Sequence, residues 1–224
     1  MTESLTEKSM LARMASLLAH EIRNPLAIMN NSIYFVKTKM TALGGLDPKV
    51  EKHLGIIEQE IAHAQEILNE VSAYTREPET VPAILKLDSC AEEFITVCKL
   101  PENIKSSVKW GAGGISASID RPQLQLALMH IVTNAVQSMP AGGKLSVCSS
   151  VSGNEAVIEI SDTGGGAKPE DLSKLAEPFY TTKARALGLG LSIVVKIMER
   201  HGGKLKLTNS EKGLTVKLFF PVKK

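Results

Sequence analysis

Residues 50–71 carry the feature that most constrains the fold, a seven-residue repeat of apolar side chains. The repeat alternates steps of four and three for three full heptads at Val50, Leu54, Ile57, Ile61, Ala64, Leu68 and Val71. Such a seam is typical of a coiled coil or helical bundle, because it places one apolar stripe along one side of a helix. Asp47 and Pro48 precede it and suit an N-cap and a first helical position. The pattern predicts a long helix that packs against a partner.

A second helical pattern comes before this seam and ends at Gly44 and Gly45. Its apolar residues also recur every three or four positions, at Met14, Leu18, Ile22, Pro25, Met29, Ile33, Val36, Met40 and Leu43. This spacing predicts a helix that buries one stripe against partners. Two helices cannot enclose a core, so we expect two copies of the hairpin to pair into a four-helix bundle, which makes the protein a homodimer. The alternative is that the hairpin packs on the rest of its own chain.

His20 lies on the opposite side of the first helix from this stripe. It follows Leu18 by two residues, about 200° around the helix axis, so its imidazole is offered to solvent. Taken alone, it is an ordinary surface histidine. Glu21 can orient the ring or accept its proton, and Asn24 shares its face one turn later. Pro25 lacks the N–H that would bond to residue 21 and predicts a kink.

The string from His20 to Leu26 resembles the phosphoacceptor box of the sensor histidine kinases of two-component signalling. The resemblance implies that His20 is the phosphorylated nucleophile and that Glu21 is its base. It also implies that Asn24 orients water for hydrolysis of a partner's phospho-aspartate, a phosphatase mode.

Length and composition favour two domains in a chain without membrane spans. The 224 residues are enough for a proper core, and the three cysteines show neither CxxC spacing nor a nearby histidine cluster, as in a reducing cytoplasm. Residues 1–10 carry both charge signs, unlike a secretory signal, and the longest uncharged stretch, 122–143, contains several polar side chains. Only 4% of residues are aromatic and the net charge is +2, so nucleic-acid binding is not expected.

The predicted domain boundary follows residue 78, inside a proline-containing linker at residues 75–82. Residues 1–78 hold 8 Lys and Arg against 10 Asp and Glu, whereas residues 79–224 hold 18 against 14, which suits a polyphosphate ligand in the second domain. In that domain we expect strands and helices to alternate in an α+β sandwich, with helices on one face of a mixed sheet. The expected strands are 84–87, 105–110, 114–119, 144–151, 156–161, 204–209 and 215–220, and the expected helices are 88–99, 121–139 and one from about 188.

Two glycine-containing segments mark a candidate ligand site. Asp162 ends an alternating strand and precedes Gly164 and Gly166, where backbone can approach a ligand and a carboxylate can accept from an exocyclic amine. The alternative is an ordinary Asp-Gly turn. Gly188 and Gly190 open a helix whose free N–H groups can hold phosphates. The pattern lacks the third glycine of a dinucleotide fingerprint and the Gly-Lys-Ser/Thr of a P-loop, which excludes both sites.

Further polar residues lie between and upstream of these segments. Residues 177–183 look like a mobile segment that is anchored by Phe179 and carries the cation of Lys183. His130, Asn134 and Gln137 share one helical face, which is otherwise the polar side of an amphipathic helix.

The order of these segments resembles the catalytic ATPase domain of histidine kinases, in the GHKL superfamily shared with gyrase B, the Hsp90 chaperones and MutL. The resemblance spans roughly residues 10–210 and implies ATP and Mg²⁺ as cofactors. It assigns Asn134 to the metal, Asp162 to adenine, Phe179 to the F box, and Gly188 and Gly190 to the second glycine box. The whole implied nucleotide site is His130, Asn134, Gln137, Asp162, Gly164, Gly166, Phe179, Thr182, Lys183, Gly188, Leu189 and Gly190.

Two departures from the family pattern stand out. His130 occupies the place of a first asparagine, where a neutral imidazole could accept from a metal-bound water. The lid at residues 167–187 is short. Residues 185–187 stand where the family usually has a glycine-rich segment that leads to the second glycine box. The short lid looks like the nitrogen-regulatory type of kinase.

These features together predict a dimeric, cytoplasmic protein-histidine kinase that passes its phosphoryl group to an aspartate of a response-regulator receiver domain. One alternative is a catalytically weak dimeric scaffold whose ATP site only switches conformation. Another is a GHKL ATPase that drives mechanical work, which would not need the His20 box. No sensor domain precedes His20, so the input comes from a partner protein or from a missing part of a longer chain.

Overall fold

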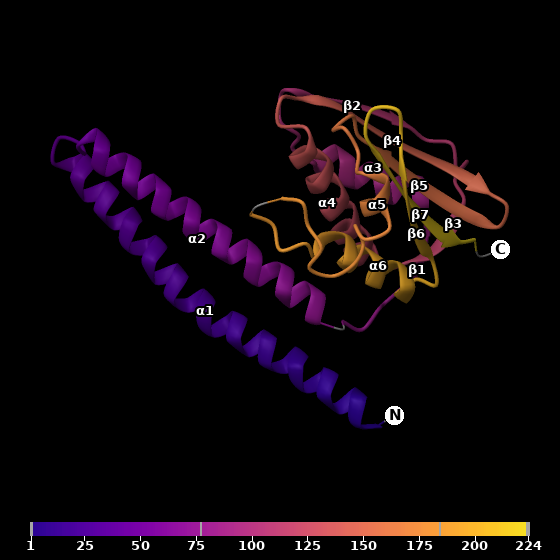
Figure 1. Ribbon diagram of the computed structural model, residues 1–224, viewed down its shortest axis with the longest axis horizontal. Helices are drawn as coiled ribbons and strands as arrows, with labels where there is room; N and C mark the ends of the chain where they lie inside the picture. The colour runs from indigo at the N-terminus through magenta and orange to yellow at the C-terminus, as the bar shows by residue number, and fades with distance from the viewer. Residues whose placement is uncertain (1, 77, 184, 223–224) are drawn as a thin grey trace. The chain divides into compact units, whose positions relative to one another are not determined.

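The computed structural model describes residues 2–76, 78–183 and 185–222, which form two compact units. The first unit is a helical hairpin of α1 (Thr2–Ala42) and α2 (Pro48–Thr75) (Figure 1). Asp47 caps α2 by accepting a hydrogen bond from the Lys49 N–H at 2.8 Å, and Pro48 is the first helical residue. Among the described residues, no helix is long and apolar enough to cross a lipid bilayer.

The hairpin core lies along the seam predicted for α2. Ile61 is buried against Leu26 and Ile33 of α1, and Leu54, Ala64 and Leu68 of α2 pack around them. Two polar contacts reinforce the pairing of the helices. The Arg23 guanidinium donates to Asn69 Oδ1 at 3.0 Å, and the Lys37 ammonium donates to Glu58 Oε2 at 2.6 Å. The predicted hairpin and the breaks at both ends of α2 are therefore present.

The stripe predicted for α1 differs from the face that the hairpin buries. Ile33 is buried as expected, but Leu18, Ile22 and Met29 are 56%, 44% and 44% exposed in the single chain. The buried side includes Ala19 and Leu26 instead. The reason is that α2 covers the side of α1 defined by positions 19, 26 and 33, which recur every seven residues. Most of the apolar stripe that periodicity identified remains uncovered in one copy of the chain.

The second unit follows the predicted order of elements. They are β1 (Ala83–Lys86), α3 (Leu87–Val97), β2 (Ile104–Lys109), β3 (Ser116–Ile119), α4 (Arg121–Ser138), β4 (Gly143–Ser152), β5 (Glu155–Ser161), α5 (Pro169–Leu172), α6 (Gly190–Arg200), β6 (Lys204–Asn209) and β7 (Leu214–Pro221). The short helix α5 was not predicted, because four residues are too few to show periodicity.

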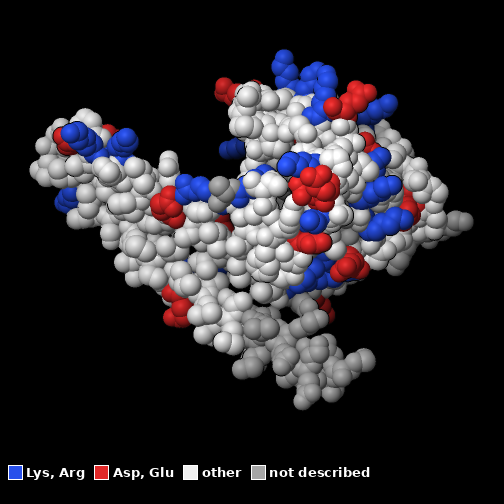
Figure 2. Space-filling model, in the orientation of Figure 1, with Lys and Arg blue, Asp and Glu red and all other residues white. Residues whose placement is uncertain are grey.

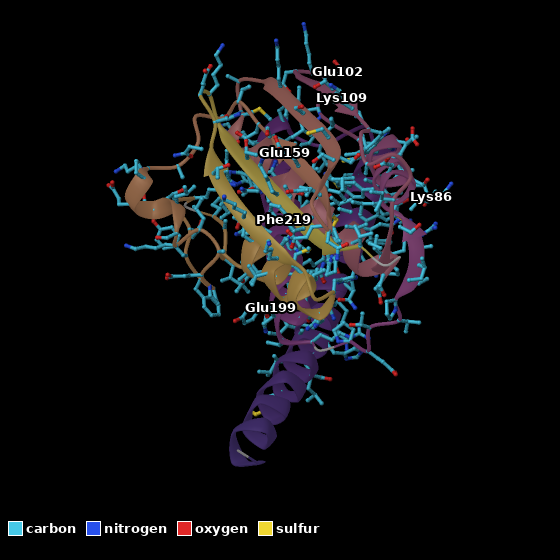
Figure 3. All side chains as sticks on the ribbon, turned by 90° about the vertical axis from the view of Figure 1, so that its right-hand side faces the viewer. Lys86, Glu102, Lys109, Glu159, Glu199 and Phe219 are labelled. Atoms are coloured by element: carbon cyan, nitrogen blue, oxygen red, sulfur yellow. The ribbon has the colours of Figure 1, made fainter. Side chains whose placement is uncertain are left out.

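Five strands form a mixed sheet in the order β2-β4-β5-β7-β6, in which only β2 and β4 are parallel. Strands β1 and β3 pair separately. Helices α3, α4 and α6 lie together on one side of the sheet (Figure 1). Lys109, Glu159 and Phe219, labelled in Figure 3, belong to the other face. This is the expected α+β domain with helices on one face of a mixed sheet.

A buried polar cluster joins the ends of the two helices that carry the candidate site. Asp120 caps α4 by accepting from the Gln123 N–H at 3.0 Å, and its other carboxylate oxygen accepts from the Val81 N–H at 2.9 Å. The Asp120 N–H donates to Nε2 of His201, the C-cap of α6, at 2.9 Å. His201 Nδ1 then donates to the Ile197 carbonyl. This cluster holds the start of α4, the end of α6 and the end of the linker together.

Candidate functional site

The phosphoacceptor candidate is exposed on α1, as predicted. The side chain of His20 is 71% exposed and that of Glu21 is 67% exposed, with 3.7 Å between His20 Nδ1 and Glu21 Oε1. Asn24 is also exposed, one turn along the helix. Helix α1 continues through Pro25 on both sides. The histidine is therefore open to reagents from solvent, with a carboxylate beside Nδ1 and with Nε2 turned away from that contact.

In the second unit, oxygen atoms of α4 surround the ammonium group of Lys183, which lies in the segment before α6. Lys183 Nζ donates to Asn134 Oδ1 at 2.5 Å and to Gln137 Oε1 at 2.9 Å, and the Asn134 carbonyl lies 3.4 Å away. We call these three oxygens the amide cage. The structure thus brings together three of the predicted site residues, which are about 50 residues apart in sequence.

The electrostatic setting of Lys183 is that of a half-buried cation near a carboxylate. Burial lowers the pKa of the Lys183 ammonium, and the negative charge of Asp162 opposes that shift. The amide cage itself contains no anionic group. Within the described residues, no cluster of three or more His, Cys, Asp and Glu side chains could hold a metal ion. The oxygen atoms that contact the Lys183 ammonium thus all belong to neutral amide groups.

Asp162 lies at the end of β5 in a fixed orientation. Its side chain is buried, and Oδ1 accepts from the Gly164 N–H at 2.8 Å and from the Leu214 N–H at 3.2 Å. Oδ2 is outside these bonds and can accept from a ligand donor. Gly213 packs so closely on Asp162 that a Cβ there would overlap the Asp162 carbonyl oxygen. Gly213 belongs to the site's construction, although nothing in the sequence pattern pointed to it.

The first glycine segment is shaped by close approaches. A Cβ on Gly164 would overlap the Ser138 hydroxyl, and Gly166 has a φ of 71°, with Asn209 Oδ1 2.8 Å from where its Cβ would be. Asn209 also forms two hydrogen bonds with the backbone of Ala167. Asn209 Oδ1 accepts from the Ala167 N–H at 3.0 Å, and Asn209 Nδ2 donates to the Ala167 carbonyl at 2.7 Å. Side chains at these glycines would displace the loop that carries Asp162. Asn209 is another contributor that sequence reasoning missed.

The second glycine segment contacts the lid through two residues with positive φ, Gly188 and Phe179. Gly188 has a φ of 73°, and its Cβ would lie 2.5 Å from the Tyr180 carbonyl oxygen. Phe179, which is 63% exposed, has a φ of 65° and donates its N–H to the Gly188 carbonyl at 3.1 Å. A positive φ is unfavourable for phenylalanine and is held here by the surrounding backbone. Leu189 is buried just before α6 begins at Gly190.

Within the lid, Tyr180 is linked to α5. A hydrogen bond between its phenol and Asp171 is the main cause that raises the pKa of Tyr180 to about 12. Neither residue was among the predicted site residues. Thr182 is exposed, next to Lys183 in the chain.

His130 differs from the other predicted site residues because one of its nitrogens is buried without a partner. Nε2 has no hydrogen-bond partner, and burial lowers the pKa of the imidazole, which favours the neutral form. Nδ1 is 3.4 Å from the position that a Cβ on Gly190 would take. His130 thus abuts the first residue of α6, and Gly190 leaves room for it.

Comparisons with known proteins agree with this architecture. Residues 10–79 match the His Kinase A (phospho-acceptor) domain, and residues 119–224 match the histidine kinase-, DNA gyrase B-, and HSP90-like ATPase family. Sporulation kinase C of Bacillus subtilis strain 168 is 29% identical over 96% of this chain and 50% of its own length. Sensor histidine kinase ZraS of Escherichia coli K12 is 26% identical over 95% of this chain and 46% of its own length.

Solved structures of histidine kinases share the fold. The catalytic domain of histidine kinase ThkA matches 63% of this chain and 96% of that domain, with 26% identity and a TM-score of 0.57. ThkA in complex with the response regulator protein TrrA matches 96% of this chain and 63% of that chain, with 27% identity and a TM-score of 0.68.

The fold and the two domain matches define a phosphoacceptor hairpin followed by a GHKL-type ATPase domain. The chain belongs to the sensor histidine kinases of two-component signalling. It spans half or less of the length of the two relatives described above.

Proposed function

We propose that this chain is an ATP-dependent protein-histidine kinase that phosphorylates His20. The observation that carries the proposal is the combination of an exposed His20 beside Glu21 with a separate unit in which Asp162, the amide cage and the glycine segments converge. One chain thus carries both a candidate site for the phosphoryl donor and a candidate phosphoryl acceptor. Phosphoryl transfer depends mainly on positioning and charge neutralisation, which this arrangement can supply.

The nucleotide would be held by groups with distinct tasks. Asp162 Oδ2 would accept from the exocyclic amine of adenine, while Oδ1 stays bonded to the two backbone N–H groups. Gly188 and Gly190 would let the backbone N–H groups at the start of α6 approach the phosphates. Thr182 and Lys183 lie on the lid segment, where Lys183 would neutralise the phosphate tail. Phe179 would fix the fold of that segment.

The donor set on α4 fits a hard divalent cation. Asn134 and Gln137 already turn amide oxygens toward one positive charge, and oxygen atoms are the ligands that Mg²⁺ prefers. Asn134 would therefore be the metal ligand, and neutral His130 could accept a hydrogen bond from a metal-bound water. Bound Mg²⁺ would neutralise charge on the phosphates.

The chemical step follows from the orientation of His20. Nδ1 faces Glu21, so Nε2 is the atom available for in-line attack on the γ-phosphorus of ATP. A bond forms between Nε2 and phosphorus, the bond from phosphorus to the ADP oxygen breaks, and the Nδ1 proton passes to Glu21. The products are phospho-His20 and ADP.

The next acceptor in this proposal is an aspartate of a response-regulator receiver domain. ThkA is solved with the response regulator TrrA, which supports a partner of this class. Leu17 and Ile28, which flank His20 along α1, are 68% and 65% exposed, and such apolar side chains favour protein docking. Asn24 on the same face could orient water against the partner's phospho-aspartate, giving a phosphatase mode.

The test is incubation of the chain with γ-labelled ATP and Mg²⁺, followed by acid and alkali treatment. We expect label on the protein that is acid-labile and alkali-stable, lost in His20→Gln but kept in the control His53→Gln, whose side chain is exposed on α2. ADP binding should be unaffected by either change, because both lie outside the ATPase unit. Normal label in His20→Gln would overturn the assignment. Released phosphate without protein label would mean an ATPase, and neither product would favour the scaffold.

A further inference from the structure

The amide cage holds a lysine where the proposed function requires a divalent cation. We propose that the Lys183 ammonium and the metal ion compete for one position on α4, so that Lys183 acts as a built-in cation that binds nucleotide when metal is absent. The inference rests on the proposed function and adds a specific task for one lid residue. It concerns nucleotide affinity with and without metal, not the transfer to His20.

The distances argue that the two cations exclude one another. Asn134 Oδ1 is 2.5 Å from Lys183 Nζ, at the short end of charge-assisted hydrogen bonds. A magnesium ion bound to the same oxygen would lie about 2.1 Å from it, which leaves the two positive centres only about 4 Å apart. The amide cage provides no carboxylate between them to screen their repulsion. Simultaneous occupation of the cage is therefore unfavourable.

The groups that form the amide cage show that the Lys183 ammonium is not held by an ordinary ion pair. A half-buried lysine usually has a carboxylate partner, but the three oxygens around this one belong to amide groups of Asn134 and Gln137. Neutral oxygens from one helix face form a cation-binding arrangement that fits either an ammonium or a hard metal ion. Asp162 attracts the lysine through its charge without appearing among these hydrogen bonds.

The lid backbone is fixed at points that leave the Lys183 side chain able to turn. The Phe179 N–H is bonded to Gly188, and Tyr180 to Asp171. The Lys183 N–H donates to Thr181 Oγ1 at 3.0 Å within the same segment. None of these bonds involves the ammonium. Rotation about the lysine side-chain bonds can therefore exchange the amide cage for a phosphate oxygen without rebuilding the lid.

Competition predicts a specific thermodynamic cycle. With metal present, the metal occupies the cage and neutralises most of the diphosphate charge, so loss of the lysine charge has a smaller effect on ADP binding than it has without metal. Without metal, Lys183 is the cation left at that position, so its loss has a large effect. Two independent cation sites would instead give the same fold-loss under both conditions.

The experiment is calorimetric titration of ADP into the full chain, in excess Mg²⁺ and in EDTA. We compare the unmodified chain, Lys183→Met, and Lys174→Met as the control, because Lys174 is exposed in the same lid. For each chain, the metal-removal factor is the ratio of the ADP dissociation constant in EDTA to that in Mg²⁺. This factor should be at least about tenfold larger for Lys183→Met than for the unmodified chain, given the usual strength of hydrogen bonds to charged groups. The factor for Lys174→Met should equal that of the unmodified chain.

The outcomes separate this inference from the proposed function. A metal-removal factor in Lys183→Met that does not exceed that of the unmodified chain overturns the competition. Absence of ADP binding by the unmodified chain in Mg²⁺ overturns the proposed function and the competition with it. Lys183→Gln is the second variant, since it keeps a polar side chain without charge, and it must show the same enlarged factor. Far-UV circular dichroism checks that each variant is folded.

Discussion

At the scale of single residues, Asp162 shows how the fold prepares a carboxylate for recognition. Two backbone N–H groups hold Oδ1, so the orientation of the whole group is set before a ligand arrives. A carboxylate held in this way can accept from an amine donor through Oδ2 with little loss of side-chain freedom. The same oxygen would not suit a carbonyl acceptor, so under the proposed function it would favour adenine over a purine with a carbonyl group at that position.

We therefore expect Asp162→Asn to weaken adenine-nucleotide binding by about 1–3 kcal/mol, the usual cost of mispairing a hydrogen bond to a charged group. The asparagine Oδ1 can still accept from Gly164 and Leu214, so the fold should be kept. Calorimetric titration with ADP measures the loss, and fluorescence of the single tryptophan, Trp110, checks the folding of the second unit. Unchanged ADP affinity would reduce Asp162 to a turn residue.

The sequence pattern predicted candidate site residues where the chemistry follows from neighbours along the chain. Asp162 and Gly188 lie in local motifs, and Asn134 lies four residues after His130 on one helix face. Gly213 and Asn209 could not be found in this way. Gly213 reaches the first glycine segment because β7 pairs with β5 in a register that places Ser161 opposite Thr215. Asn209 ends β6 and reaches it because β6 pairs with β7, which places Asn209 opposite Leu214. Strand register depends on the whole sheet, so contacts of this kind appear only in three dimensions.

At the scale of elements, the two helices of the hairpin differed in how well their burial could be predicted. In α2 the heptad seam contains the buried Ile61 and the partly buried Leu54, Ala64 and Leu68, although Val50 and Ile57 of the same seam are exposed. In α1 apolar residues cover a wider arc, and periodicity alone does not say which part α2 covers. Ala19 and Leu26 are buried, while Leu18 and Ile22 are exposed. The choice between them depends on the geometry of helix pairing, not on the pattern of either helix.

The start of α4 is the element boundary with the largest predicted contribution to stability. Asp120 accepts from the Gln123 and Val81 N–H groups, so Asp120→Ala removes a helix cap and also the partner of a partly buried N–H in the linker. We expect the free energy of unfolding of the second unit to fall by at least about 2 kcal/mol. Urea unfolding followed by Trp110 fluorescence measures this change.

Asp47→Ala is the matched control for Asp120→Ala. Asp47 caps α2 through a single exposed hydrogen bond, and its replacement should lower the stability of the hairpin by only about 1 kcal/mol. Helical ellipticity reports on that change. Equal losses in the two variants would mean that the bond from Asp120 to the linker adds nothing to the cap.

At the scale of the whole molecule, the hairpin has more apolar surface than one copy can cover. Leu18, Ile22 and Met29 of α1 and Val50 and Ile57 of α2 are each between 44% and 56% exposed. In Figure 2 much of the hairpin surface carries no charged side chain. Several exposed apolar side chains on both helices of a hairpin are typical of an interface. The family match to the phospho-acceptor domain supports a second copy as the partner.

We expect the unmodified chain to sediment as a dimer and Ile22→Glu to shift it toward monomer. The substitution places a charge in the middle of the uncovered stripe, where pairing would bury it without a partner. Each variant chain brings one such charge, so a symmetric dimer would hold two of them at one interface. The loss should be at least about tenfold in the dimerisation constant, since a buried unpaired charge is worth several kcal/mol. Sedimentation equilibrium over a range of chain concentrations measures it.

Asn31→Glu is the control for this dimerisation test, because position 31 lies on the exposed side of α1 that carries His20, about 20° from it around the helix. A glutamate there stays in solvent in either oligomeric state, so the dimerisation constant should not change. Ile22 lies within the hairpin unit and makes no part of the ATPase unit, so ADP affinity should be the same in both variants. A dimer that is equally stable in Ile22→Glu would mean that the hairpin pairs through another face, and a monomeric unmodified chain would leave its apolar stripe for a different partner.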